Sequence, residues 1–139
     1  MIERILLALI AGLFISAMNT TDEKTYTLAT DYTITIKGTS NLHNWEEKVE
    51  EVSGDIIVKW NDDRTFDLEA VAIKIAVHSI KSEMGIMMDN NTYKALQADR
   101  HPEITFTLLQ PLKSIQTDRI EQTLSIKGTL CIAGVNRSV

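Results

Sequence analysis

The sequence predicts an all-β domain, and three observations support this. Apolar and polar side chains alternate along most of the chain after residue 24, a period that is typical of half-buried strands. Clusters of turn-forming residues such as 61–64 (NDDR) separate the alternating stretches. One segment, residues 82–99, lacks this alternation and contains good helix formers instead. We therefore expect about seven strands and one short helix, and this number of strands favours a barrel or a sandwich.

The expected strands follow one another along the chain. The clearest of them lie at residues 32–36, 56–60, 66–77, 104–108 and 120–132, the last interrupted by Gly128. Within residues 66–77 the apolar side chains change parity, since Leu68 and Ala70 share one parity whereas Val71 and Ile73 share the other. A β-bulge near residues 70–71 would produce this change and would let a long strand bend.

The helical segment, residues 82–99, precedes the strand at residues 104–108. Asp89, Asn90 or Asn91 is expected to cap a short helix that includes residues 93–98, because their side chains accept hydrogen bonds from free backbone N–H groups. Pro102 disfavours helical geometry at His101 and so opens the next strand.

The first residues differ from the rest of the chain. Residues 5–17 (ILLALIAGLFISA) form an apolar run of 13 residues without a charge. This run is shorter than the roughly 20 residues that a membrane-spanning helix needs, and it resembles the core of a secretory signal peptide. We expect a signal peptide over residues 1–17, and therefore an exported protein. The alternative is a buried N-terminal helix.

Length, charge and cysteine content narrow the class of protein. A chain of 139 residues is expected to form one domain. The 14 basic and 19 acidic residues give a net charge of −5 without a basic cluster, which argues against a nucleic-acid partner. The single cysteine, Cys131, excludes an internal disulfide.

The sequence contains no recognisable catalytic or metal-binding pattern. The three histidines are 35 and 23 residues apart and do not form a metal-ligand pattern. A G-x-S-x-G nucleophile motif is also absent from the sequence. The glutamates at positions 46, 47, 50 and 51 surround Lys48 and are interpreted as a solvated face. We expect no enzymatic activity, no cofactor and no metal ion.

Two other features suggest a binding site. Residues 39–45 (TSNLHNW) form a polar segment that places His43 and Trp45 between strands, where they would lie at the mouth of a barrel. The alternative is an ordinary loop whose Trp45 packs on the core. Met84, Met87 and Met88 lie near the helical segment and would suit a lid over an apolar cavity, because thioethers adapt to varied shapes. Plain core packing is the alternative for these methionines.

Three motifs, in this order, resemble those of the YceI-like family. Residues 38–45 (GTSNLHNW) resemble its early motif, residues 88–96 (MDNNTYKAL) and 101–106 (HPEITF) its central block, and residues 128–139 (GTLCIAGVNRSV) its late strand pair. The resemblance extends from about residue 26 to the last residue. It implies an extended, lipocalin-like antiparallel β-barrel whose apolar tunnel holds a polyisoprenoid or similar long-chain amphiphile. It also implies export to the bacterial periplasm.

The resemblance, combined with the alternating pattern, assigns two sets of ligand-binding residues. The expected tunnel wall consists of Tyr32, Ile34, Ile36, Leu68, Ile73, Ile75, Phe106 and Leu108. The expected mouth consists of His43, Trp45, Arg100 and His101, with Arg100 as the partner of an anionic head group. The ligand is expected to be a long-chain isoprenoid or fatty amphiphile. The functional alternative is a stress-related protein-interaction module without a lipid function, and a lipid-modifying enzyme is the least favoured reading.

The chain departs from the family pattern at its C-terminus, because the pattern continues with further strands beyond Val139. We expect a barrel that lacks its final strands, a tunnel that is slit open, and exposed strand edges that favour a homodimer. Adding the missing strands is expected to raise the melting temperature sharply. After cleavage of the signal peptide, no membrane-spanning segment is expected.

Overall fold

The structure is a computed structural model that describes residues 22–118 and 121–139. The expected signal peptide, residues 1–17, lies outside these ranges. The described residues form ten β-strands, one short 3₁₀ helix and one α-helix, so the predicted all-β class is confirmed. None of the helices within these ranges is long and apolar enough to span a membrane.

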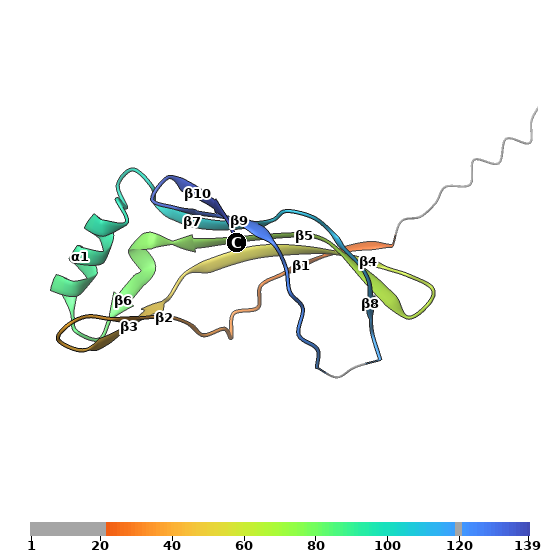
Figure 1. Ribbon diagram of the computed structural model, residues 1–139, viewed down its shortest axis with the longest axis horizontal. Coiled ribbons are helices and arrows are strands. Elements are labelled where there is room, and N and C mark those ends of the chain that lie inside the picture. Colours follow the sequence, from red (N-terminus) through yellow and green to blue (C-terminus); the bar gives the residue numbers. More distant parts are fainter. Residues whose placement is uncertain (1–21, 119–120) are drawn as a thin grey trace, which may run out of the picture.

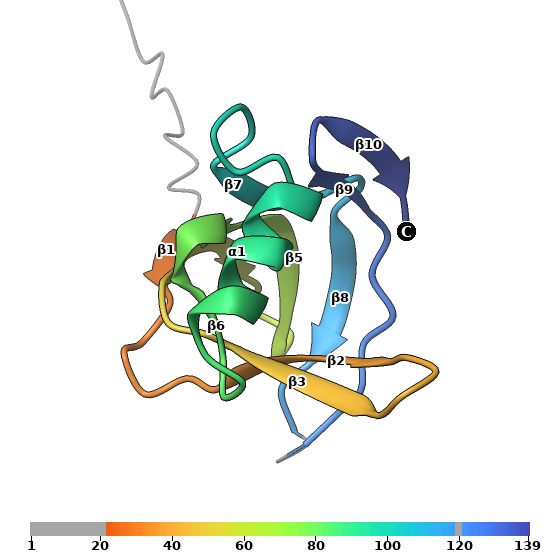
Figure 2. The same ribbon diagram turned by 90° about the vertical axis from the view of Figure 1, so that its left-hand side faces the viewer.

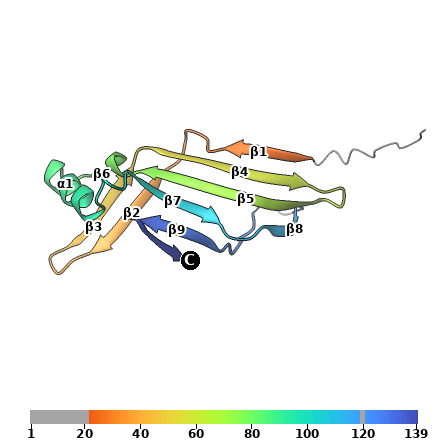
Figure 3. The ribbon, with the colours of Figure 1, turned by 90° about the horizontal axis from the view of Figure 1, so that it is seen from above.

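Seven of the strands form one long antiparallel sheet (Figure 1). Its order is β1-β4-β5-β7-β9-β10, and β8 pairs with the part of β5 that β7 leaves free (Figure 3). The strands are β1 (Glu23–Thr27), β4 (Val52–Trp60), β5 (Thr65–Ala76), β7 (Glu103–Leu108), β8 (Leu112–Gln116), β9 (Gly128–Ile132) and β10 (Val135–Ser138). Strands β1 and β10 lie at opposite edges and do not pair, so the strands described form an open sheet.

A smaller sheet and the helix lie at one end of the long sheet. The smaller sheet has the order β2 (Ile34–Thr39), β3 (Asn44–Val49), β6 (Ile80–Ser82). The 3₁₀ helix η1 (Val77–Ser79) joins β5 to β6, and α1 (Ile86–Ala95) follows β6. Seen end-on, α1 lies in front of the long sheet, with β2 and β3 below it (Figure 2).

The long sheet has one apolar face, because residues paired across antiparallel strands project to the same side. The register aligns Gly54, Ile73, Phe106 and Leu130 in one row across the sheet. We call the side of this row the inner face. It also carries Val58, Leu68, Val71, Ile75, Ile104 and Ile132, whereas Lys74, Thr105 and Thr107 lie on the other, outer face.

Two apolar clusters occupy opposite ends of the inner face. The first lies at the α1 end and has Val49, Val77, Ile80, Ala98 and Ile104 at its centre. The second lies around the β4–β5 hairpin and β8 and has Val58, Leu68, Val71 and Ile115 at its centre. The side chains of Ile75 and Ile73, neighbours on the inner face of β5, pack against the first and the second cluster respectively. The core therefore extends along the sheet.

The predicted bulge in the long strand is confirmed. Ile57 pairs with Ala70 and Val58 with Leu68, so Glu69 is the extra residue, next to the predicted position at 70–71. Because of this extra residue, Leu68 and Val71 both lie on the inner face although they are three positions apart. The bulge thus explains the change of parity in the sequence.

Other strand predictions need correction. The strand expected to begin at residue 120 begins at Gly128, and residues 121–127 belong to no strand. Strand β9 is paired with β7. This pairing stops at Gly128, because its partner Leu108 is the last residue of β7. The residues before Gly128 therefore have no neighbouring strand there. The count of about seven strands was also too low, because β6 and β10 are short and polar, and β3 carries a glutamate among its alternating positions.

The expected helix is present, but it starts earlier than predicted. Gly85, with φ of 89°, occupies the N-cap position, and α1 begins at Ile86. The prediction of a cap at Asp89, Asn90 or Asn91 is therefore wrong. Asp89 lies in the first turn of α1, where its carboxylate accepts a hydrogen bond from the backbone N–H of Ser82 at 2.7 Å. It thereby connects α1 to β6.

Candidate functional site

An apolar cavity of about 430 Å³ lies between α1, the β2–β3 hairpin and the ends of β7 and β9. We call it the α1 cavity. Its lining residues are Ile36, Trp45, Glu47, Met88, Asn91, Thr92, Ala95, Leu96, Ile104 and Ile132. Ile104 and Ile132 belong to the inner face, so the cavity continues that face beneath the helix. A mostly apolar wall with a few polar groups is typical of sites for small apolar ligands.

The carboxylate of Glu47 is the charged group in this wall. Glu47 is 3% exposed, and its Oε1 accepts a hydrogen bond from the Thr92 hydroxyl at 2.5 Å. Its neighbours on β3 point the other way, where Glu46 pairs with Lys37 and Lys48 with Glu83. The prediction that these glutamates form a solvated face is therefore wrong for Glu47. Alternation along β3 places Glu47 and Val49 on the same side, and for Glu47 this is the side that faces α1.

Trp45 lies at the edge of the same cavity. Its ring packs against Gly38, its partner on β2, so closely that a Cβ added to Gly38 would lie 2.1 Å from the ring. Glycine at position 38 therefore lets the indole approach the backbone of β2 closely. Trp45 is half-buried and lines the cavity. Its position therefore combines the expected place at a binding site with the alternative, in which the ring packs on the core.

His43 lies in the tight turn between β2 and β3. The hydroxyl of Ser40 organises this turn by donating to the His43 carbonyl at 3.0 Å. The His43 ring is exposed and lies 3.3 Å from the sulfur of Met84, outside the α1 cavity. Among the three methionines expected to form a lid, Met88 lines the cavity, whereas Met84 and Met87 are 58% and 78% exposed.

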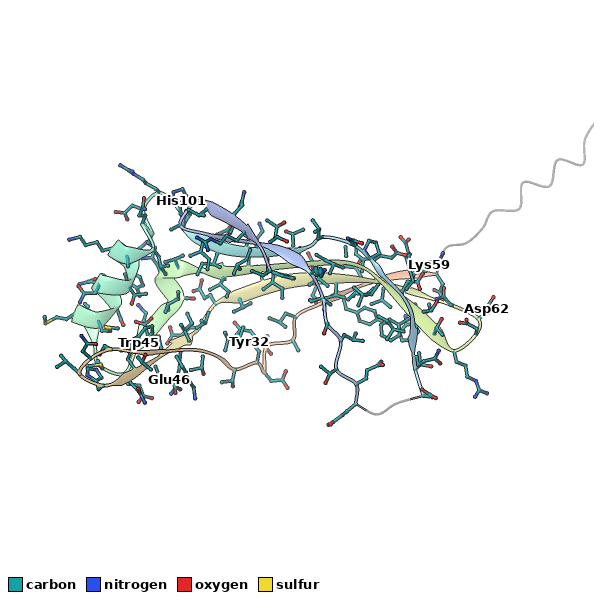
Figure 4. The ribbon with its side chains drawn as sticks, viewed as in Figure 1. Tyr32, Trp45, Glu46, Lys59, Asp62 and His101 are labelled. Carbon is teal, nitrogen blue, oxygen red and sulfur yellow. The ribbon has the colours of Figure 1, made fainter. Side chains whose placement is uncertain are left out.

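The other two expected mouth residues lie elsewhere. Arg100 lines a polar hollow on the other side of α1, together with His78, Lys94 and Asp99. The ring of His101 packs against Gly134 in the β9–β10 turn, where an added Cβ would lie 2.5 Å from it. Figure 4 shows Trp45 and His101 at opposite edges of this end of the molecule. The structure therefore does not bring the four expected mouth residues together.

The residues expected to form a tunnel wall are divided between the two clusters. Ile34, Ile36 and Ile75 pack against the cluster at the α1 end, and Leu68, Ile73, Phe106 and Leu108 belong to the second cluster or pack against it. Tyr32 has a different position. Its hydroxyl donates to the Glu50 carbonyl and accepts from the Val52 N–H, each at 2.9 Å, which fastens the segment before β2 to the β3–β4 turn.

Helix α1 is held over the cavity by contacts with β6. The Tyr93 hydroxyl lies 2.9 Å from the carbonyl oxygens of both His78 and Ile80. Lys81 donates to the same hydroxyl at 2.7 Å and lies 3.8 Å from Asp89. The bond to Tyr93 and the nearby acidic groups raise the pKa of Lys81 above its usual value. These contacts fix the side of the helix that carries Asp89 and Tyr93 to η1 and β6.

The family comparison agrees with this architecture. The YceI-like domain matches residues 20–139, which is most of the chain. The chain belongs to the YceI-like family. None of the curated proteins compared with it matches. Within the described ranges of this YceI-like chain, no three or more His, Cys, Asp or Glu side chains are grouped so that they could hold a metal ion.

Sequence reasoning missed several residues of the α1 cavity in this YceI-like protein. The missed set is Glu47, Asn91, Thr92, Ala95, Leu96, Ile104 and Ile132. A signal for Glu47 was present, because Trp45, Glu47 and Val49 alternate with polar residues in the manner of a strand. The contribution of α1 could not be inferred in the same way, because the chain packs this helix against a hairpin about 45 residues earlier.

Proposed function

We propose that this YceI-like protein is an exported binding protein that holds a long-chain isoprenoid or similar amphiphilic lipid. The main observation in support is the inner face, which is apolar along the sheet and ends in the α1 cavity. Tyr26, Ile56 and Trp60 lie on this face and are 44%, 37% and 38% exposed. A long apolar ligand that covered such side chains would gain roughly 25 cal/mol for each Å² removed from water.

The proposal includes a lipocalin-like barrel interior as the binding site. The long antiparallel sheet, its bulged central strand and its single apolar face are features that such a barrel requires. The α1 cavity lies within the range of volumes, roughly 300–1,000 Å³, that small-molecule sites occupy. Export to the periplasm is part of the proposal and rests on the apolar run at residues 5–17.

An alternative is a stress-related protein-interaction module that has no lipid function. The exposed side chains of Leu42, Met84, Ile86 and Met87 favour it, since they lie on or beside the β2–β3 turn and at the start of α1. Large exposed apolar side chains that lie near one another are typical of contact surfaces. In this alternative the inner face would serve only as a scaffold.

Native mass spectrometry of protein purified from its own host tests the proposal. We expect a retained ligand whose mass corresponds to a long-chain lipid. Consistently ligand-free protein would contradict lipid binding and favour the interaction module. The same spectra would report whether two copies associate.

A pair of helix variants locates the bound lipid. Ala95→Trp would fill the α1 cavity from the helix, whereas Lys94→Trp adds the same ring one residue earlier, beside the polar hollow. We expect the first variant to lose most of the lipid and the second to retain it. Equal occupancy in the two folded variants would show that the ligand does not use the α1 cavity.

A further inference from the structure

The carboxylate of Glu47 indicates which head group the α1 cavity accepts. The side chain is 3% exposed and lines an otherwise mostly apolar wall. Removing a carboxylate from water costs free energy unless hydrogen bonds replace its hydration. A carboxylate accepts through two oxygens, and among the residues that the structure describes the donor to Glu47 is the Thr92 hydroxyl, on Oε1. Glu47 therefore retains the capacity to accept a further hydrogen bond from a group in the cavity.

The surrounding charges favour a donor over an anion. The lining residues in the described part of the chain include no Lys, Arg or His. The nearest lysines on β3 and β6 have other partners, since Lys48 pairs with Glu83 and Lys81 with Tyr93 and Asp89. Arg100 lines the hollow on the other side of α1. An anionic head group in the α1 cavity would thus face Glu47 without a compensating cation.

Two other polar groups, one in the cavity wall and one on the inner face, do not change the preference for a hydrogen-bond donor. Asn91 lines the cavity, but its amide both donates and accepts and so does not discriminate between head groups. Arg137 pairs with Leu130 across β9 and β10, so it lies on the inner face, but it does not line the cavity. A cation there could bind an anion only outside the α1 cavity.

We propose that the α1 cavity receives the head group of a long-chain isoprenoid alcohol or amine, whose O–H or N–H donates a hydrogen bond to Glu47. The apolar chain then extends from Ile104 and Ile132 along the inner face. The same carboxylate disfavours isoprenoid acids and phosphates. This inference rests on the proposed lipid-binding function. It specifies a head group that donates a hydrogen bond, whereas the sequence-based expectation for Arg100 was an anionic head group.

The test compares ligands that differ only in the head group. Geranylgeraniol, geranylgeranylamine and geranylgeranoic acid would be titrated into delipidated protein, with displacement of an apolar fluorescent probe as the measurement. We expect the alcohol and the amine to bind about tenfold more tightly than the acid, since hydrogen bonds to charged groups are worth about that factor or more. Equal or tighter binding of the acid would overturn the inference.

Two glutamate variants show whether Glu47 is responsible. Glu47→Gln keeps an oxygen that can accept from Thr92 but removes the charge, and we expect it to reduce the preference at least threefold, roughly half of the tenfold effect on a logarithmic scale. Glu46→Gln is the matched control, because Glu46 is the preceding residue on β3 and faces solvent. An unchanged preference in Glu47→Gln would overturn the inference.

The outcomes distinguish the inference from the proposed function. Binding of all three compounds with equal affinity would contradict only the role of Glu47. Binding of none would contradict the lipid-binding function, and the inference with it. The comparison in the wild-type protein decides the question even if Glu47→Gln does not fold.

Discussion

Asp67 shows how one buried carboxylate organises the end of the sheet far from α1. It accepts hydrogen bonds from the backbone N–H of Ser114 at 2.8 Å and the Asn61 amide at 3.1 Å, and it pairs with Lys113 at 3.2 Å. Ser114 has a φ of 56°, a conformation that non-glycine residues seldom adopt. These donors, with the Ser114 N–H foremost, lower the pKa of Asp67 below its ordinary value.

The lowered pKa of Asp67 predicts a dependence of stability on pH. Because the folded state holds the carboxylate charged where the unfolded chain binds a proton, its contribution is present above the ordinary aspartate pKa. It is lost as the pH falls through that value towards the lowered one. We expect Asp67→Asn to flatten the acidic part of a plot of unfolding free energy against pH, measured by urea denaturation. Asp62→Asn is the control, since Asp62 is exposed in the neighbouring turn; equal slopes for the two variants would contradict the prediction.

Gly38 controls the position of the Trp45 ring at the α1 cavity. A methyl group at position 38 would overlap the indole, so Gly38→Ala is expected to displace the ring and to lower the free energy of unfolding by about 1–3 kcal/mol. Tryptophan fluorescence in a Trp60→Phe background would shift to longer wavelength as the ring gains contact with water. Lys37→Ala, at the preceding exposed position, is the control. An unchanged spectrum in Gly38→Ala would show that the ring does not depend on this glycine.

At the scale of single residues, the sequence indicated which residue types contribute to the site better than it indicated where each residue lies. Trp45 and Met88 were recognised as candidates from their residue types, and both line the α1 cavity. Arg100 and His101 were assigned to the same mouth, but the segment between α1 and β7 places Arg100 at the hollow beside Lys94 and His101 against Gly134. Glu47 was missed because its burial depends on α1, whose packing the local sequence does not encode.

At the scale of elements, the bulge in β5 keeps one apolar face continuous along a strand of 12 residues. Deleting Glu69 would restore regular alternation, so Leu68, Ile73 and Ile75 would remain on the inner face. We expect a folded protein of lower melting temperature, because the bend and the contact between Glu69 and Lys113 are lost. Circular dichroism during heating measures both the folded secondary structure and the melting temperature.

Deleting Ala72 from the same strand is the matched comparison. This deletion would move Ile73 and Ile75 to the outer face or shift the whole register, since a change of one residue reverses the direction of every following side chain. We expect the cooperative thermal transition to be lost. If both deletions had the same effect, the bulge would not be what keeps the face continuous.

Elements were predictable where local periodicity and burial agree. Strand β5 and strand β7 have strongly apolar alternate positions, and both were recognised. Strand β3 was interpreted as a loop followed by a charged run, because its outer positions are charged and one of its inner positions is a glutamate. The pairing of β3 with β6, whose partner residues lie 31 to 35 positions later, is a tertiary property that a local pattern does not report.

At the scale of the whole molecule, two apolar clusters lie along one sheet, and β5 contributes to both. Strands β4, β5 and β7 connect the two ends through hydrogen-bonded pairs along their length. This arrangement differs from a single compact core, and it leaves the middle of the inner face with exposed apolar side chains such as Ile56. The all-β class followed from the alternating pattern, whereas the division of the core into two clusters did not.

The shared strands predict that the two clusters unfold together. Ile80→Ala removes a fully buried side chain from the first cluster, and Ile115→Ala removes a buried side chain from the second. Each is expected to lower the free energy of unfolding by about 2–5 kcal/mol. The two residues belong to different clusters, so the effects in the double variant should add within about 0.5 kcal/mol, and urea denaturation should show one transition. If Ile80→Ala instead produced two separate transitions, the ends of the sheet would be independent, and a ligand along the inner face would have to connect them.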